Sequence, residues 1–418
     1  MRIHTSFVLV IACLNQQAFA VTETAPARRG SAQEAAPPPL MHAQDVPSAI
    51  MPAAPSGTAA VVVPAPPALS ARAWLLLDFH SGRVLAEGNA DARAEPASLT
   101  KMMTIYTVAG LLKEGRIELT DLVPISARAR GMIGSRMFVE GGSRVTLEDL
   151  MKGDIIQSGN DASVALAEYV GGSEEAFASL MNQNAARMAM TGTRFANSTG
   201  LPDAGHYSTA RDLARLAVAL IRDHPEVYSW FSIREFTHGN ITQPNRNKLL
   251  WRDTSVDGIK TGYHEAAGYC LAASALREGM RLVAIVLGSE GEDARADAAQ
   301  TLLNYGFRFY ETRKLFTGGV PIRDTRVWKG EADTVALGVQ RDLHVTYPRG
   351  LSRHLKTVIR LEGKVIAPVR AGDPQGRLEV TVDGQSVAER PVIALASIAA
   401  AGIVGRAVDA VRLWFERL

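Results

Sequence analysis

The chain of 418 residues is long enough for two or three domains. Hydrophobic residues make up 47% of it and charged residues 21%, so most of the chain can bury a core. A net charge of +2 offers no concentrated basic surface of the kind that nucleic-acid binding uses, so we expect no nucleic-acid partner.

The first 20 residues have the features of an export signal. An apolar run from Phe7 to Ala12 follows a basic residue, and Ala18-Phe19-Ala20 offers a small-residue cleavage site. The run is too short to span a bilayer, which needs ~20 residues. A short buried helix is one alternative, and Val10 to Cys13 loosely resembles a lipoprotein cleavage box, which would lipidate Cys13. We predict a signal peptide over residues 1–20 and export of the protein.

The next segment, residues 21–70, is rich in Ala and Pro. This composition predicts a disordered or polyproline-like linker with little to pack. Cleavage after Ala20 would leave Cys270 as the only cysteine, so no internal disulfide could form. Cys270 lies in an apolar run, which favours a buried structural thiol.

We predict a first folded domain over residues 71–316. Two β-rich runs around His80-Ser81-Gly82 indicate a hairpin. Strands near both ends of the region with helices between them predict an α/β (α+β) sandwich with a mainly antiparallel sheet. The predicted helices cover 95–115, 146–171 with a break at 157–161, 174–190, 209–222 and 295–311, and the predicted strands cover 73–78, 83–87, 256–262, 268–275 and 281–288.

The residue pattern of the sequence changes after Thr317-Gly318-Gly319. Short β-type runs alternate with Gly, Asp and Pro turns, which predicts a small all-β domain over residues 317–396. We find no catalytic constellation in it. The predicted strands are 325–328, 343–347, 357–361, 378–382 and 392–395.

The last stretch, residues 400–418, has apolar and polar residues on opposite sides at helical spacing. Val404, Val408, Trp414 and Phe415 share one side, and arginines lie mostly on the other. Aromatic residues on an apolar face opposite a basic face favour a helix lying in the plane of a membrane surface. The alternative is a helix packed on its own domain or on a partner.

Ser98 and Lys101 carry the first chemical signal. Residues three apart share a helix face, so the hydroxyl and the amine would be neighbours. That pair is a possible nucleophile and base. A Ser-x-x-Lys occurs about once by chance in a chain this long. Alone, Ser98 would be interpreted as an N-cap and Lys101 as a solvated residue.

Two further motifs strengthen the signal. Ser158-Gly159-Asn160 supplies a hydroxyl and an amide at a helix break, and Lys260-Thr261-Gly262 precedes a strand. Without the others, each would be an ordinary turn. Together the three motifs supply what acyl transfer needs: a nucleophile at Ser98, a lysine whose pKa is lowered by burial and by a second cation, and a cationic site for a carboxylate. Gly262 has no side chain, so a ligand backbone can lie against it.

The order Ser-x-x-Lys, Ser-x-Asn, Lys-Thr-Gly resembles the penicillin-binding protein and serine β-lactamase superfamily. The flanking segments PASLTKMMT, IIQSGNDA and VDGIKTGYHEAAGYCLAASA are similar to the low-molecular-mass penicillin-binding proteins that act as serine-type D-alanyl-D-alanine carboxypeptidases. The resemblance runs from about residue 71 to residue 418. It implies a transpeptidase-like domain, a β domain and a terminal helix.

The resemblance also implies roles for individual residues. Ser98 would form the acyl-enzyme, Lys101 would be its base, and Ser158 and Asn160 would assist. Lys260, Thr261 and Gly262 would line the site for the terminal carboxylate of a D-Ala-D-Ala peptide. Arg295 matches an arginine near that carboxylate and Arg246 a second one. Penicillins would acylate Ser98. No cofactor or metal is implied.

Two positions depart from the family pattern. Tyr263 follows Lys-Thr-Gly where His is common, and Asn197-Ser198-Thr199-Gly200 replaces a loop that contains His-Gly. A zinc-protease helix is excluded because His264-Glu265 lacks its second histidine at Gly268.

Three functions follow from these patterns. The leading one is a carboxypeptidase that removes the terminal D-Ala from peptidoglycan stem pentapeptides, at the periplasmic face of the inner membrane. A β-lactamase is the alternative enzyme, although residues 187–201 lack the Glu-x-x-x-Asn of a deacylating base. A non-catalytic module that binds the cell wall is the third.

Overall fold

The computed structural model describes residues 63–415. The predicted signal peptide, most of the predicted linker and residues 416–418 lie outside the described residues. The chain already contacts the fold before the predicted boundary at residue 71. The hydroxyl of Tyr305 donates to the carbonyl of Pro64 at 2.9 Å, and Val63 and Leu69 pack against a buried apolar cluster.

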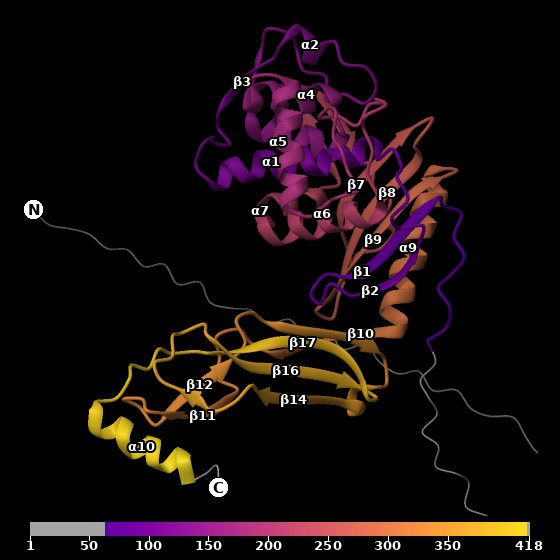
Figure 1. The fold of residues 1–418 in the computed structure, drawn as a ribbon. Coiled ribbons are helices and arrows are strands. Elements are labelled where there is room, and N and C mark those ends of the chain that lie inside the picture. Colours follow the sequence, from indigo (N-terminus) through magenta and orange to yellow (C-terminus); the bar gives the residue numbers. More distant parts are fainter. Residues whose placement is uncertain (1–62, 416–418) are drawn as a thin grey trace, which may run out of the picture. The chain divides into compact units, whose positions relative to one another are not determined.

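A five-stranded antiparallel sheet forms the centre of the first domain, with strand order β2-β1-β9-β8-β7 (Figure 1). Both faces of the sheet are buried. Val283, Ile285 and Leu287 of the central strand β9 pack into one apolar cluster, and their neighbours Leu282, Ala284 and Val286 pack into another. This double burial explains why the strand is apolar throughout instead of alternating. The strands are β1 (Ala73–Asp78), β2 (Val84–Gly88), β7 (Val256–His264), β8 (Gly268–Arg277) and β9 (Met280–Ser289).

Helices cover both faces of this sheet. The helices α1, α4, α5 and α6 contribute to one cluster. Most of the helical part of the other comes from α9 (Glu292–Phe309), with Leu249 and Leu250 of a short helix beside it. The predicted α/β sandwich is therefore confirmed. The other elements are α1 (Lys101–Lys113), α2 (Ala127–Arg130), α3 (Leu147–Lys152), α4 (Asn160–Gly171), α5 (Glu174–Arg187), α6 (Ala210–Asp223), α7 (Pro225–Tyr228), α8 (Leu249–Arg252), β3 (Leu122–Pro124) paired with β4 (Arg144–Thr146), and β5 (Glu235–His238) paired with β6 (Ile241–Pro244).

The helix predicted over residues 95–115 is divided in two. A 3-10 turn at Ala97–Thr100 precedes α1, so Ser98 lies before the α-helix and is not its N-cap. Ala97 has a positive φ of 46°, and the Leu99 amide donates to the Pro96 carbonyl at 3.1 Å, which makes the entry tighter than an α-turn.

The helix predicted over residues 295–311 is also shifted. It begins three residues earlier, where Glu292 and Asp293 place negative charge in its first turn. It ends at Phe309, because Tyr310–Phe316 forms β10 and pairs with β13. Tertiary pairing here overrides the helical pattern of the last predicted turn.

The second folded region is all-β, as predicted. Its six-stranded sheet has the order β14-β16-β17-β12-β11-β15, and β10 pairs with β13 (Leu343–Pro348) beside it. β10, β12 and β15 were not predicted. The remaining strands are β11 (Arg323–Trp328), β12 (Thr334–Gly338), β14 (Leu355–Leu361), β15 (Val365–Ile366), β16 (Pro374–Val382) and β17 (Gln385–Ala394).

The final helix, α10 (Ile403–Phe415), follows the β domain in the chain (Figure 1). Most of its apolar side chains are exposed to solvent. Val404 is 78% exposed, Trp414 59% and Phe415 62%. Asp409, on the polar side, accepts a hydrogen bond from the Lys329 amide at 2.6 Å. The helix therefore touches the β domain through its polar side. No helix among residues 63–415 is both long enough and apolar enough to cross a bilayer.

Candidate active site

The 3-10 turn brings Ser98 and Lys101 together. Side chains at i and i+3 eclipse each other in a 3-10 turn, and Lys101 Nζ lies 3.2 Å from Ser98 Oγ. The amine is fully buried. The turn thus places a hydroxyl next to an amine that solvent does not reach.

Two further oxygen atoms fix this amine. Lys101 Nζ donates to Asn160 Oδ1 at 2.7 Å and to the carbonyl of Thr199 at 2.8 Å. A carbonyl oxygen can only accept, so a neutral Lys101 amine would direct its two N–H groups at these oxygens. Its lone pair would then face Ser98 Oγ, which is the orientation that a general base requires.

The helix break predicted at residues 157–161 presents Asn160. A π-helical turn at Gly153–Gln157 ends at Ser158, whose φ is +65°, and α4 begins at Asn160. The Asn160 amide donates through Nδ2 to the carbonyl of Ile133 at 2.7 Å, which fixes its oxygen toward Lys101. Ser158 is 2% exposed, and its hydroxyl makes no side-chain hydrogen bond within residues 63–415.

The Lys-Thr-Gly motif lies on β7, the edge strand of the sheet, which packs against the turn that carries Ser98. Lys260 and Thr261 are 2% and 5% exposed. A Cβ on Gly262 would lie 3.0 Å from the Ser98 amide nitrogen and 3.0 Å from the Pro96 carbonyl oxygen. Glycine therefore lets the edge strand approach the turn that carries Ser98 more closely than a residue with a side chain would.

Two arginines approach the same strand and helix break. Arg295, 4% exposed, donates through Nη1 to the carbonyl of Gly262 at 3.1 Å and lies over the ring of Tyr269. Arg246 donates through Nε to the carbonyl of Gln157 at 3.1 Å. Ser98, Lys101 and Asn160 are thus joined by direct hydrogen bonds, and the charges of Arg246 and Arg295 contribute to lowering the pKa of Lys260.

Burial dominates the electrostatics of the pocket. It lowers the pKa of Lys101 to about 8, against the opposing charges of Asp154 and Asp161. Burial, followed by repulsion from Lys101, holds the pKa of Lys260 well below its usual value. The pocket therefore brings the deprotonation of Lys101 down from a pKa of 10.5 to about 8, so the neutral amine that acyl transfer from serine needs becomes accessible at mildly alkaline pH.

Asp154 was not predicted as part of the site. It is fully buried in the π-helical turn and accepts a hydrogen bond from Ser163 Oγ through Oδ1, whereas its Oδ2 has no hydrogen-bond partner among residues 63–415. Burial raises the pKa of Asp154 to about 6, although the charges of Lys101 and Lys260 oppose the shift. A charged residue inside the apolar segment 153–156 was the sequence signal for it.

The carbonyl of Thr199 and the ring of His206 were also missed. The Ala196 amide donates to His206 Nδ1 at 3.2 Å, so Nε2 carries the proton and donates to Thr100 Oγ1, 2.8 Å away. Burial lowers the pKa of His206 to about 4. A backbone carbonyl leaves no trace in a residue pattern, and a lone histidine is too common to assign.

The two departures from the family pattern are Tyr263, at the edge of the site, and the loop that begins at Asn197, beneath it. Tyr263 is 54% exposed and stacks on Tyr269, with 4.2 Å between the ring centroids. Asn197 organises the loop that follows it: its Oδ1 accepts from the amides of Thr199 and Gly200, and its Nδ2 donates to the carbonyl of Leu201.

Comparison with known proteins gives consistent matches. Residues 60–291 match the D-alanyl-D-alanine carboxypeptidase family model, and residues 310–400 match the C-terminal domain of penicillin-binding protein 5. The chain is 43% identical over 374 residues to D-alanyl-D-alanine carboxypeptidase DacC of Escherichia coli, covering 87% of this chain and 93% of that protein.

Solved structures agree. Penicillin binding protein 5 from Haemophilus influenzae superimposes with a TM-score of 0.77 at 38% identity, covering 80% of this chain and 99% of that one. A penicillin-binding protein from Listeria monocytogenes in its ampicillin-bound form gives a TM-score of 0.54 at 29% identity, covering 58% and 98%.

Proposed function

The chain belongs to the D-alanyl-D-alanine carboxypeptidase family of low-molecular-mass penicillin-binding proteins, and from this premise we propose that Ser98 is the nucleophile and Lys101 its base. The protein is a serine-type D-alanyl-D-alanine carboxypeptidase that acts on peptidoglycan peptides. Its match to the family over most of the chain favours this activity over a β-lactamase or a non-catalytic wall-binding module.

Acylation begins with the neutral amine of Lys101. Ser98 Oγ attacks the carbonyl carbon of the penultimate D-Ala, and its proton passes to Lys101 Nζ. The negative charge on the carbonyl oxygen is stabilised by backbone N–H groups, among them that of Ser98. The C–N bond then breaks, and the proton held by Lys101 passes through the Ser158 hydroxyl to the leaving D-Ala amine, so that Lys101 is neutral again. An ester on Ser98 remains.

Deacylation returns the enzyme to its starting state. A water molecule attacks the ester carbonyl and gives a proton to Lys101. The C–O bond to Ser98 breaks, Ser98 Oγ is reprotonated, and the shortened peptide leaves with a new carboxylate. A β-lactam acylates Ser98 by the same attack, with opening of its ring. The ampicillin-bound relative supports this ligand class.

The substrate carboxylate would lie at Lys260 and Thr261. Lys260 is a buried amine whose pKa is lowered, so an incoming carboxylate would restore its charge. Arg246 and Arg295 add positive charge to the same region. Because β7 is an edge strand, the peptide backbone can pair with its free backbone groups.

The set of three bonds made by Lys101 Nζ carries this proposal. It is tested by intact-mass analysis after incubation with benzylpenicillin and, separately, with a peptide ending in D-Ala-D-Ala. We expect a lasting penicilloyl adduct on Ser98, release of D-Ala, and neither product in Ser98→Ala. Release of D-Ala by Ser98→Ala would refute the assignment of the nucleophile. Rapid return to the unmodified mass with hydrolysed penicillin would indicate a β-lactamase.

We also propose that the protein is exported and held peripherally on the periplasmic face of the inner membrane by α10. The exposed apolar side of α10 and its tether through Asp409 support this. Sedimentation with vesicles of phosphatidylglycerol and phosphatidylcholine tests it. We expect the full chain to pellet and a chain truncated after Ala400 to stay in solution; pelleting of the truncated chain would exclude the anchor.

The mass of the mature protein tests the signal peptide separately. Cleavage after Ala20 gives a chain that begins at Val21, whereas lipidation would retain residue 13 with attached acyl chains. A mature protein that still carries Met1 would contradict both alternatives.

A further inference from the structure

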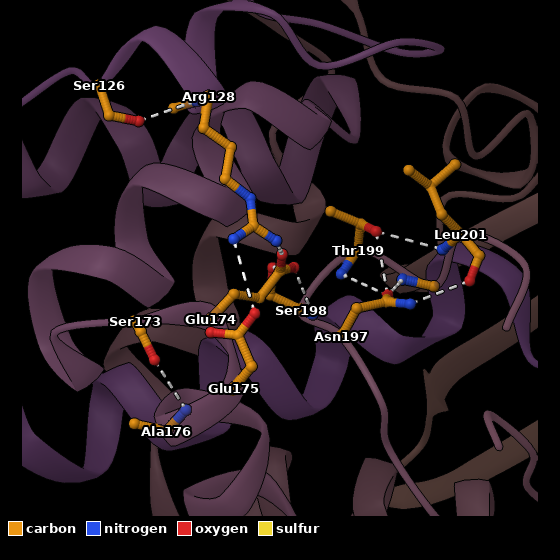
Figure 2. Close-up of polar contacts among 12 residues, drawn as sticks. Ser126, Arg128, Ser173, Glu174, Glu175, Ala176, Asn197, Ser198, Thr199 and Leu201 are labelled. Carbon is orange, nitrogen blue, oxygen red and sulfur yellow. Dashed lines mark hydrogen bonds and ion pairs between the residues drawn. The ribbon is translucent and has the colours of Figure 1, made fainter.

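The loop that carries the Thr199 carbonyl is held by a buried carboxylate. Glu174, the first residue of α5, is 6% exposed. Its Oε1 accepts hydrogen bonds from the Ser198 amide at 3.0 Å and from the Ser198 hydroxyl at 2.7 Å. Figure 2 shows the carboxylate between this loop and Arg128, whose Nη2 is bound to Oε2. Glu174 therefore joins three segments that are distant in sequence.

Ser198 is held through its N–H, its hydroxyl and its carbonyl. Its N–H and hydroxyl are bound by Glu174 on α5, and its carbonyl accepts from Thr104 Oγ1 on α1 at 2.7 Å. The next carbonyl along the chain, that of Thr199, accepts a hydrogen bond from the Lys101 amine. The position of Ser198 thus determines where one of the two fixed acceptors of the base lies.

The same loop also touches the nucleophile turn. Gly200 has a φ of +81°, and a Cβ there would lie 1.9 Å from the carbonyl oxygen of Ala97. A displacement of the loop would therefore move both the acceptor of Lys101 and the support beneath Ser98. Because the interior is close-packed, such a displacement is transmitted to its neighbours.

We propose that Glu174 is a positioning residue for the catalytic base. By anchoring Ser198, it holds the Thr199 carbonyl at the distance where Lys101 directs an N–H to it and its lone pair to Ser98. The inference rests on the proposed function, because it takes Lys101 as the base. Glu174 itself does not touch the substrate.

Other contacts of the loop fix its internal shape more than its position. Asn197 binds the amides of Thr199 and Gly200 and the Thr199 hydroxyl, all within the loop. Without Glu174 the loop would keep its turn and shift as a unit. A shift of about 1 Å at a reacting group can reduce a rate about a hundredfold, and the remaining bond to Thr104 limits the shift.

The chain offers variants that separate anchoring from charge. Glu174→Gln keeps an oxygen that can accept both bonds from Ser198 and loses the ion pair with Arg128. Glu174→Ala loses both interactions. Glu175→Ala is the matched control, because Glu175 is in the same helical turn, has a 75% exposed side chain and lies 3.7 Å from Arg128 without touching the loop. Ser198→Ala removes one of the two anchoring bonds.

The test is acylation by benzylpenicillin, followed at varied ligand concentration and by intact mass. Because Glu174 does not touch the substrate, its replacement should leave carboxylate binding at β7 unchanged, and the half-saturating concentration should stay within about twofold of wild type. The limiting acylation rate k2 should fall about tenfold or more in Glu174→Ala. Glu174→Gln should retain most of k2, Ser198→Ala should lose less than Glu174→Ala, and Glu175→Ala should match wild type.

The adduct stoichiometry separates positioning from misfolding. A positioning defect lowers k2 while one penicilloyl group per chain is still reached, whereas partial unfolding lowers the final stoichiometry. Wild-type k2 in Glu174→Ala, or an equal loss in Glu174→Gln and Glu174→Ala, would overturn the inference. Failure of the wild-type protein to acylate would instead overturn the proposed function.

Discussion

Replacing Asp154 by Asn should move the pH dependence of acylation. Asp154 is the charge that most favours the ammonium form of Lys101, and its pKa of about 6 leaves it ionised where Lys101, with a pKa of about 8, titrates. Asn has nearly the same shape and can still accept from Ser163 Oγ. Removal of the negative charge should therefore lower the pKa of Lys101 with little change in packing.

The expected shift is about one to two pH units, which is the usual effect of an opposite charge near a buried amine at an effective dielectric constant of about 20. Each unit corresponds to about 1.4 kcal/mol. The assay is k2 for a penicillin at saturating concentration from pH 5 to 10, where the ligand carboxylate keeps Lys260 charged. In wild type k2 should rise through about pH 8 as Lys101 loses its proton.

In Asp154→Asn the midpoint of the rise of k2 with pH should lie at a lower pH. The plateau value of k2 at high pH should fall modestly, because a less basic amine is a weaker proton acceptor. Asp149→Asn is the control: it removes a carboxylate from the adjacent helix α3, and the Asp149 side chain is 43% exposed. A midpoint that stays at the wild-type value or moves upward would refute the electrostatic role of Asp154. An equal shift in Asp149→Asn would show a general charge effect.

Three other outcomes follow from the same contacts. Gly262→Ala should reduce k2 at least about tenfold, because its Cβ would lie 3.0 Å from the Ser98 amide nitrogen, whereas Gly291→Ala, which meets open space, should not. The affinity for a β-lactam that carries a carboxylate should fall as the pH rises through the lowered pKa of Lys260, since binding then requires Lys260 to take up a proton. A half-saturating concentration that stays constant from pH 5 to 10 would contradict this prediction. Because the pKa of His206 is lowered from 6.5 to about 4, the free energy of unfolding should decrease as the pH falls from 6.5 to 4, on the order of 3 kcal/mol, and urea unfolding of His206→Gln should lack this dependence.

Much of the fold follows from patterns in the sequence. The strands β8 and β9 were predictable as apolar runs bounded by turns, and the helices α4 to α6 as longer segments with apolar residues at helical spacing. The end of α9 could not be predicted, because Tyr310 belongs to a strand only through its pairing with Pro348, which is distant in sequence. The same holds for β12 and for the two-residue strand β15.

The predicted site residues were those whose side chains carry the chemistry and whose motifs have fixed spacing. Ser98, Lys101 and Asn160 are in direct contact in the structure. The missed groups act through the backbone or through burial. The position of the Thr199 carbonyl depends only on the path of its loop. In the sequence Glu174 resembles an ordinary acidic residue in the first turn of a helix, and only the structure shows its hydrogen bond to Ser198.

In the proposed mechanism the two lysines of the site have opposing requirements. Lys101 must be neutral to accept the proton of Ser98, whereas Lys260 must be charged to hold a carboxylate, and each disfavours charge on the other in one buried pocket. In the free enzyme burial, and after it this repulsion, keep the pKa of Lys260 low. A bound carboxylate restores the charge on Lys260, and its own negative charge opposes the effect of that ammonium on Lys101. The ion pair at β7 therefore leaves the base near its pKa of about 8, which burial and Asp154 determine, and a ligand without a carboxylate loses affinity more than activation of Ser98.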